Sequence, residues 1–260
     1  MKGLAEAVRA AGALALDYFK GTVKSWDKAP GDPVSEADLA VDKLLHQNLR
    51  ALAPDAGWLS EESIVGRKPL PERRLWVVDP IDGTRAFVEK RPEFAVSVAL
   101  VEDARPVAAA VFNPATGEFF EAEAGRGARL NGQRLRVSAR DAVDGARLLS
   151  GTGSAKRLGW LSETGQPARA AEVGRINSIA YRLCLVASAR FDGVVSLGHK
   201  SDWDLAAADL IVAEAGGQST DDKGRPFLYN REGLRHPAVV AANPTLNARL
   251  REEIARMPKS

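Results

Sequence analysis

The sequence contains little cysteine and little histidine. Cys184 is its single cysteine, and histidine occurs only three times among 260 residues. One thiol excludes an internal disulfide framework and any zinc site built from several cysteines. Cys184 lies in the apolar stretch AYRLCLVAS, which favours a helical core position over the anion-binding loop of a cysteine phosphatase. The histidines, His46, His199 and His236, are isolated from one another and provide no histidine-nucleophile site.

Net charge and long apolar runs are also nearly absent. The chain has 36 basic and 34 acidic residues, a balance of +2, and its lysines and arginines are scattered. This balance argues against a nucleic-acid polymer or a membrane surface as partner. No apolar run is long enough to span a bilayer. Glu6, Arg9 and Asp17 interrupt the apolar N-terminal stretch, which indicates an amphipathic helix rather than a signal peptide. With one cysteine, the sequence predicts a cytoplasmic protein.

Hydrophobic periodicity predicts two helices ahead of a sheet in the first half of the chain. Helical spacing runs up to Gly21 and again from Ser35 to just before Pro54, with a loop between the two helices. From residue 92 the apolar pattern alternates with a period of two, and Asn131-Gly132 is a hairpin turn. We therefore expect a largely antiparallel sheet covered by two helices. The expected apolar face of the second helix consists of Leu39, Leu45, Leu49 and Leu52.

The second half alternates between strands and helices. Helical patterns cover residues 177–191, 202–217 and 244–257, with short apolar strands between them. Such alternation is typical of α/β architecture. We expect an α/β (α+β) fold with an N-terminal α+β subdomain at residues 1–140, which holds most metal ligands. A C-terminal α/β subdomain at residues 141–260 completes the site, so that the two form one catalytic unit.

The stretch LWVVDPIDGTRAF, residues 75–87, carries the most distinctive chemistry. It leaves an apolar strand and places Asp79, Asp82, Gly83 and Thr84 within six residues. An Asp-Pro-x-Asp-Gly run is also good turn chemistry by itself, so this stretch alone leaves a plain turn open. An aspartyl-nucleophile phosphatase carries two aspartates separated by one residue. Here two residues intervene, so the nucleophile-plus-acid pair is not reproduced.

Acidic residues at the ends of other segments favour a metal site over a plain turn. These residues are Asp38, Glu61, Glu62, Asp202 and Asp204. Hard divalent cations such as Mg²⁺ bind carboxylate and carbonyl oxygens and keep open positions for water and phosphate. Asp79, Asp82 and one carbonyl between them suit that need. Gly83 allows close approach of an oxyanion to its own N–H group and to that of Thr84. The sequence therefore predicts a site for magnesium and phosphate.

Three motifs relate the chain to a known family. SEES, WVVDPIDGT and DWDLAAADLIVAEAGG occur in the order and approximate spacing of the inositol monophosphatase superfamily, and the chain resembles this superfamily over nearly its whole length. The resemblance implies a Mg²⁺-dependent, lithium-sensitive phosphomonoesterase with two or three metal ions and a small phosphate ester as substrate. It also implies a layered αβαβ sandwich, commonly in homodimers, and in-line attack by a metal-activated water without a covalent enzyme intermediate. A regulatory pseudo-phosphatase is the non-enzyme alternative.

The resemblance also assigns roles to individual residues. It implies that the metal ligands are Glu61, Asp79, the backbone carbonyl of Ile81, Asp82 and Asp204. Thr84, with Asp38 behind it, would orient the attacking water, and Glu61 counts with these two as a catalytic residue. The N–H groups of Gly83 and Thr84 would bind the phosphate.

The stretch VVSLGHKSDWD bears on the substrate. Inositol phosphatases bind ring hydroxyls with a glutamate where this chain has Leu197, which accepts no such hydrogen bonds. His199 and Lys200 instead place a cation beside the site, which suits a substrate with a second phosphate. The motifs look closest to bacterial 3'(2'),5'-bisphosphate nucleotidases of the CysQ type, which convert adenosine 3',5'-bisphosphate to adenosine monophosphate and phosphate. The alternative is an inositol-1-monophosphatase or another small sugar or histidinol phosphate phosphatase.

Other residues near these motifs have weaker assignments. Nucleotidases often carry a basic residue where this chain has Ser196. Arg175 or Arg182 is the candidate substitute, and the alternative is that both are surface charges. Glu62 is the weaker of the adjacent glutamates and is expected behind the metal ligands. Lys28 precedes the loop that leads to the second helix and is expected to neutralise negative charge there.

Overall fold

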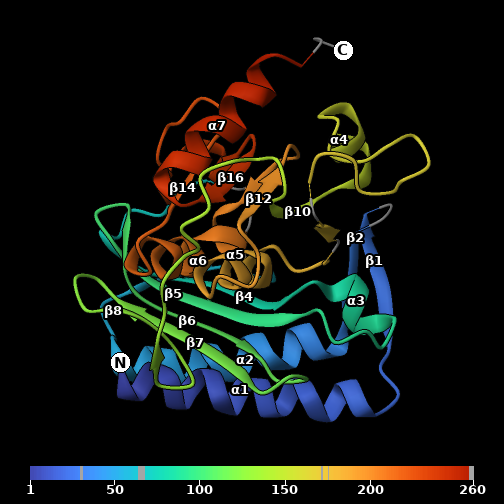
Figure 1. Cartoon of the computed structure of the whole chain (residues 1–260). Coiled ribbons are helices and arrows are strands. Elements are labelled where there is room, and N and C mark those ends of the chain that lie inside the picture. Colours follow the sequence, from blue (N-terminus) through green and yellow to red (C-terminus); the bar gives the residue numbers. More distant parts are fainter. Residues whose placement is uncertain (30–31, 64–67, 171, 175, 258–260) are drawn as a thin grey trace.

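Three helical layers alternate with two sheets in this chain (Figure 1). A computed structural model describes residues 1–29, 32–63, 68–170, 172–174 and 176–257. The helices α1 and α2 cover one face of the larger sheet, and α5 and α6 lie between the two sheets. The helix α7 packs against the outer face of the smaller sheet. The predicted α/β class and layered sandwich are confirmed.

The larger sheet has seven strands in the order β3-β4-β5-β6-β7-β8-β9. β3 is parallel to β4, and every later neighbouring pair is antiparallel. Asn131 and Gly132 form the tight turn between β8 and β9 with φ of 48° and 83°, as predicted. The strands are β3 (Gly57–Ser60), β4 (Arg74–Asp82), β5 (Ala95–Glu102), β6 (Arg105–Asn113), β7 (Glu118–Glu123), β8 (Gly127–Leu130) and β9 (Gln133–Arg134).

Two long helices cover one face of this sheet. Leu45 and Leu49 are fully buried against the sheet and α1. Leu39 and Leu52, expected on the same apolar face, are 46% and 48% exposed, so this expectation is wrong. Leu39 lies about 120° around the helix from Leu45 at 100° per residue, and Leu52 is the last helical residue. The two helices are α1 (Lys2–Lys20) and α2 (Glu36–Leu52).

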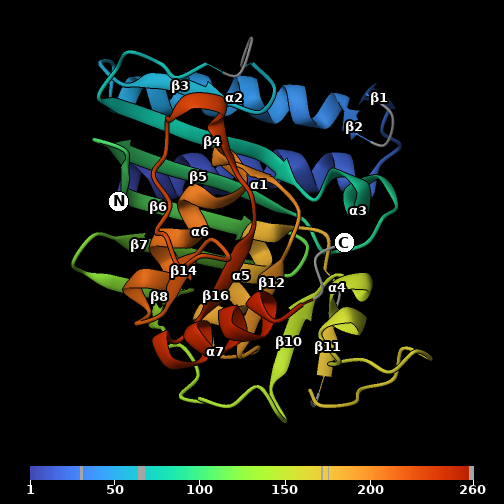
Figure 2. The same cartoon turned by 90° about the horizontal axis from the view of Figure 1, so that it is seen from above.

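The smaller sheet has five strands in the order β11-β10-β12-β16-β14. β10 is parallel to β11 and β12, whereas β16 is antiparallel to both of its neighbours. Figure 2 shows α7 beside β16 and β12. The strands are β10 (Arg147–Ser150), β11 (Glu172–Gly174), β12 (Gly193–Ser196), β14 (Gln218–Thr220) and β16 (Val239–Ala242), and the outer helices are α4 (Thr152–Arg157) and α7 (Pro244–Ala255).

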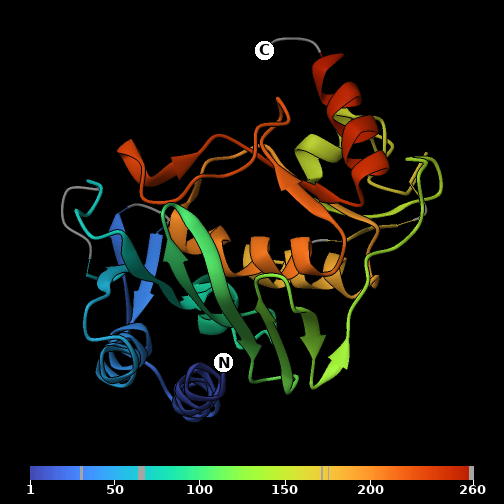
Figure 3. The ribbon, with the colours of Figure 1, turned by 90° about the vertical axis from the view of Figure 1, so that its left-hand side faces the viewer.

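The helices α5 (Ile179–Ala187) and α6 (Asp202–Glu214) occupy the layer between the sheets (Figure 3). α6 contacts β5 and β6 on one side and β14 on the other. Its sequence is apolar around most of its circumference, as required for a helix that is buried on all sides. α6 belongs to the second half of the chain but packs on the first sheet, where it also contacts β4.

Several short elements surround the end of β4. β1 (Ser25–Ala29) and β2 (Asp32–Ser35) form an antiparallel pair where the sequence indicated only a loop, of which residues 30–31 lie outside the described residues. α3 (Thr84–Val88) follows β4 after a single glycine. β13 (Lys200–Ser201) pairs with β15 (Arg235–His236), which follows the 3-10 helix η1 (Glu232–Leu234). Among the described helices, none combines the length and the apolar character needed to cross a membrane.

Packing on α2 leads to a first prediction. Leu45→Ala is expected to lower the free energy of unfolding by about 2–5 kcal/mol, because it leaves a cavity between α2, α1 and the sheet. Leu39→Ala, on the same helix but half exposed, is the matched control and should change it by less than about 0.5 kcal/mol. Urea denaturation followed by circular dichroism measures both. Equal losses in the two variants would contradict the burial of Leu45.

Candidate metal and phosphate site

A bulge at the end of β4 turns two aspartates to the same side. Asp79 pairs with Ser97 and Asp82 pairs with Ala95, so three steps on β4 oppose two steps on β5. Residues three apart on a regular strand face opposite sides of a sheet, and one extra residue in a bulge reverses that relation. Pro80 lies inside the bulge, where its missing N–H breaks no regular ladder. The local sequence thus directs both carboxylates to one place.

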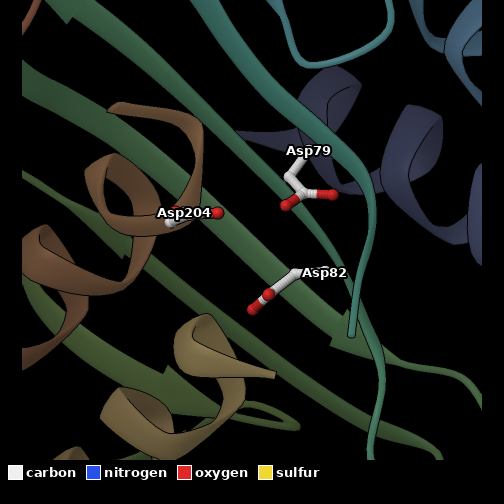
Figure 4. Close-up of side chains that lie close together, drawn as sticks. All are labelled: Asp79, Asp82 and Asp204. Atoms are coloured by element: carbon white, nitrogen blue, oxygen red, sulfur yellow. The ribbon is translucent and has the colours of Figure 1, made fainter. Parts of the chain in front are cut away.

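Asp204 brings a third carboxylate from the other half of the chain. It lies in the first turn of α6, where its Oδ2 accepts a hydrogen bond of 2.6 Å from the backbone N–H of Ser201. Carboxylate oxygens of Asp79, Asp82 and Asp204 all lie within 4.8 Å of one another. Figure 4 shows the side chains of Asp79 and Asp82 extending from β4 and that of Asp204 from the start of α6 toward a common space.

The negative charges of the three carboxylates repel one another. Burial and the neighbouring acids Glu61, Asp82 and Asp204 raise the pKa of Asp79 well above its usual value. Burial raises the pKa of Asp82 to about 6, and burial together with Asp82 raises that of Asp204 to about 7. Three hard oxygen donors in a buried region of concentrated negative charge fit a divalent cation such as Mg²⁺.

Glu61 and Glu62 approach the same region and share one lysine. Nζ of Lys28, on β1, lies 3.2 Å from Oε1 of Glu61 and 2.6 Å from Oε1 of Glu62. Burial opposes the charge on Lys28, but the two glutamates outweigh it and raise the pKa of Lys28 to about 12. Glu61 lines the cavity described below, although it lies outside the tight group of three aspartates. Lys28 therefore offsets negative charge at this edge, as the sequence indicated.

Thr84 connects Asp38 to the β4 turn. Its Oγ1 lies 3.2 Å from Oδ1 of Asp38 and 3.0 Å from the carbonyl oxygen of Ile81. The other oxygen of Asp38 accepts hydrogen bonds from the backbone N–H and the hydroxyl of Ser35, at 2.8 and 2.6 Å. Burial nevertheless raises the pKa of Asp38 to about 6. A hydroxyl has one hydrogen and two lone pairs, so a Thr84 that donates to Asp38 keeps an acceptor for water.

Gly83 is required by the geometry of the turn. Its φ is 96°, in the left-handed region that disfavours side chains. A Cβ at this position would also lie 2.8 Å from the carbonyl oxygen of Glu93 and 3.1 Å from the backbone nitrogen of Ser178. Gly83 therefore lets the chain turn from β4 into α3 while the segment before α5 packs directly against it.

These residues line a cavity of about 560 Å³. The acidic side chains of Glu61, Asp79, Asp82 and Asp204 belong to its lining, and so do the cationic side chains of Arg85, Arg182 and Lys200. Leu197 and Ser196 also line it, whereas His199 is exposed and is not among the described lining residues. Burial lowers the pKa of Arg182, whose Nε donates a hydrogen bond to the carbonyl oxygen of Ile176. Arg175 lies outside the described residues.

Ser178 is a site residue that sequence reasoning missed. Its Oγ donates a hydrogen bond of 2.6 Å to Oδ2 of Asp82, and the backbone N–H of Ala180 donates another of 2.6 Å to the same oxygen. A serine ahead of an apolar helical run is a recognisable N-cap signal. That signal predicts the start of a helix but says nothing about a contact with a residue 96 positions away.

Asp202 serves the scaffold rather than the cavity. Its carboxylate accepts a hydrogen bond of 2.5 Å from the backbone N–H of Asn230 and lies 2.9 Å from Nε2 of His236. His236 also packs against the rings of Phe227 and Tyr229. These contacts fasten β13 to β15 immediately before α6 begins, and so support the strand that carries Lys200.

Comparison with known proteins agrees with this site. The family model described as the inositol monophosphatase family matches residues 1–257. The chain belongs to the inositol monophosphatase family. Members of this family are metal-dependent phosphomonoesterases, and the chain is a phosphatase of this class.

Relatives within the family carry different names. An inositol-1-monophosphatase of Rhizobium meliloti is 38% identical over 233 residues, which cover 88% of this chain and 85% of that protein. The 3'(2'),5'-bisphosphate nucleotidase CysQ of Aggregatibacter actinomycetemcomitans is 33% identical over 230 residues, which cover 86% and 85%. The crystal structure of the extragenic suppressor protein suhB from Bartonella henselae matches with a TM-score of 0.85 and 31% identity, covering 98% of both chains. These relatives share one family, but their names point to different substrates.

The repulsion between the buried carboxylates leads to a second prediction. Raised pKa values mean that the folded, metal-free protein binds more protons than the unfolded chain, so its stability falls as pH rises through them. Asp79→Asn removes one charge while its amide oxygen still accepts from the N–H of Ile81. At pH 8 without metal, this variant should therefore unfold at a higher temperature than the wild type.

Added Mg²⁺ should reverse that order. At about 100 times its Kd, Mg²⁺ adds about 2.7 kcal/mol to the free energy of unfolding of the wild type. Asp79→Asn should gain clearly less because it loses a carboxylate ligand. Differential scanning calorimetry measures both effects, and Asp17→Asn, at an exposed position on α1, is the control that should follow the wild type. A metal-free Asp79→Asn that is less stable than the wild type would contradict the repulsion.

Proposed function

We propose that this chain is a 3'(2'),5'-bisphosphate nucleotidase that hydrolyses adenosine 3',5'-bisphosphate to adenosine monophosphate and phosphate. The observation that carries the proposal is the cavity, whose lining combines the acidic side chains of the metal site with the cationic side chains of Arg182 and Lys200. The acidic side chains suit a metal-bound phosphate, and the cations suit a second phosphate on the same substrate. A monophosphate of a neutral alcohol has no group that needs these cations.

The acidic side chains of the cavity provide the metal ligands in this proposal. Mg²⁺, as two or three ions, would be held by a ligand set consisting of Glu61, Asp79, the carbonyl of Ile81, Asp82 and Asp204. When bound, Mg²⁺ supplies charge neutralisation for the phosphate and lowers the pKa of water. On the basis of the family resemblance, we also propose that Li⁺ inhibits the enzyme and that the protein forms a homodimer.

The chain's own groups would place the attacking water and the phosphate. Thr84, donating its hydrogen to Asp38, presents a lone pair that accepts a hydrogen bond from water and aims the water at phosphorus. The N–H groups of Gly83 and Thr84, at the start of α3, would donate to the phosphate oxygens. Asp38 is held by Ser35 and therefore keeps Thr84 in one orientation.

Leu197 and Arg182 favour adenosine 3',5'-bisphosphate over inositol 1-phosphate as the substrate. Leu197 lines the cavity where inositol phosphatases carry a glutamate, so ring hydroxyls find no carboxylate there. We infer that Arg182 replaces the basic residue that nucleotidases carry at the position of Ser196, and that Lys200, which also lines the cavity, assists it. Inositol 1-phosphate remains the second candidate because a relative at 38% identity is named an inositol-1-monophosphatase. His199 is exposed and is not among the described residues that line the cavity, so its proposed contact with the substrate requires its side chain to move toward the cavity.

Removal of the Thr84 hydroxyl tests the orientation of water. Thr84→Ala should lower kcat by about 100-fold, the cost of a misplaced reactant, and change KM by only a few-fold. Thr84→Ser keeps the hydroxyl and is the matched control, with kcat within a few-fold of the wild type. Steady-state phosphate release at saturating Mg²⁺ measures both variants. Equal kcat values for Thr84→Ala and the wild type would exclude this role for Thr84.

The substrate assignment is tested by a panel of phosphate esters. We expect kcat/KM for adenosine 3',5'-bisphosphate to exceed the values for inositol 1-phosphate, fructose 1,6-bisphosphate and histidinol phosphate. Arg182→Gln should lower kcat/KM for adenosine bisphosphate by about 10- to 100-fold, the worth of a charge-assisted hydrogen bond. The same change should leave hydrolysis of inositol 1-phosphate nearly unaffected. A clear preference for inositol 1-phosphate would overturn the assignment, and an absence of phosphate release would favour a regulatory pseudo-phosphatase.

A further inference from the structure

The hydroxyl group of Ser178, the residue before α5, makes two hydrogen bonds. Ser178 is fully buried and is the N-cap of α5. Its Oγ accepts a bond of 3.0 Å from the backbone N–H of Tyr181 and donates one of 2.6 Å to Oδ2 of Asp82. The acceptor role belongs to any good N-cap residue, whereas the donor role requires a hydroxyl. Ser178 therefore joins the start of a helix to a residue of the acidic group.

Two donors from the same turn fix the carboxylate of Asp82. The Ser178 hydroxyl and the N–H of Ala180 both reach Oδ2 at 2.6 Å, and neither bond uses Oδ1. Two convergent donors at one oxygen hold the carboxylate in a single rotation about its bond to the chain. Oδ1 then has a fixed direction relative to Asp79 and Asp204, whose oxygens lie within 4.8 Å.

The support behind Ser178 is rigid. α5 is buried along nearly its whole length between the two sheets, with Leu183 and Val186 fully enclosed. On its other side Ser178 packs so closely on Gly83 that an added Cβ there would lie 3.2 Å from the Cβ of Ser178. The backbone that carries the donor hydroxyl therefore cannot move far from Asp82 without displacing either the helix or the β4 turn.

We propose that Ser178 is a positioning residue for Asp82, which sets the direction in which this carboxylate meets the metal. The proposal rests on the proposed metal site but not on the choice of substrate. Groups that orient a metal ligand from behind typically contribute 10- to 100-fold to metal affinity. Ser178 does this by holding Asp82, and it also caps α5.

The experiment separates the donor role from the capping role. Ser178→Ala removes both, whereas Ser178→Gly removes the hydroxyl but caps the helix almost as well as serine, within a few tenths of a kcal/mol. Asn243→Ala is the matched control: Asn243 caps α7 by accepting a bond of 3.0 Å from the N–H of Leu246, away from the acidic group. Mn²⁺ serves as the probe, titrated without substrate and followed by electron paramagnetic resonance, while calorimetry gives Tm.

We expect the Kd for Mn²⁺ to rise about 10- to 100-fold in both Ser178 variants and to stay within two-fold of the wild type in Asn243→Ala. Tm should fall in all three variants, and it should fall less in Ser178→Gly than in Ser178→Ala, because glycine keeps the helix cap and loses only the bond to Asp82. An unchanged Kd in folded Ser178→Gly would overturn the proposal, and so would an equal rise in Asn243→Ala. A wild type that binds no Mn²⁺ would instead refute the proposed metal site, and a wild type that binds Mn²⁺ but prefers another ester would refute only the substrate assignment.

Discussion

The close approach of buried carboxylates is the constraint on which the rest of the structure depends. Asp79 and Asp82 are buried, Asp204 is partly buried, and their carboxylates repel one another, so the fold must hold them together against this force. The bulge in β4 aims two of them, and the capping bond at Ser201 aims the third. The surrounding layers supply the stability that this arrangement requires, since each sheet is packed on both faces by buried apolar side chains.

The helices α5 and α6 convert that constraint into a defined cavity. Both lie between the sheets, and both approach the end of β4 with their first turns: the N–H of Ala180 donates to Asp82, and a carboxylate oxygen of Asp204 lies within 4.8 Å of one of Asp82. A helix N-terminus is electropositive and favours nearby anions, which suits Asp82 beside α5 and Asp204 within α6. Arg182 lies on α5, and Lys200 lies on β13 immediately before α6; both side chains line the cavity. Metal ligands and substrate-facing cations therefore depend on the same packing.

The sequence predicted those parts of the site that consist of contiguous residues. The bulged Asp79–Thr84 stretch and the first turn of α6 are local motifs, so their acids were predictable, and the family followed from their order. Contacts between distant segments were not predictable, as the bond from Ser178 to Asp82 illustrates. Helical periodicity alone also predicted that Leu39 is buried, although it is exposed. A sequence does not reveal how much of the apolar face of α2 the sheet and α1 cover. The lining of the cavity by Lys200 and not by His199 depends on pairing between β13 and β15.

The location of Asp204 on a different half of the chain from Asp82 has a consequence for the stability of the folded protein. A cation held by both would join two points that are 122 residues apart in the sequence. Because the two ligands meet only when both halves have folded, the ion would bind the folded state alone, and its binding free energy would add to the stability of that state. The ion would then join α6 to the larger sheet, and a chelator would remove this link.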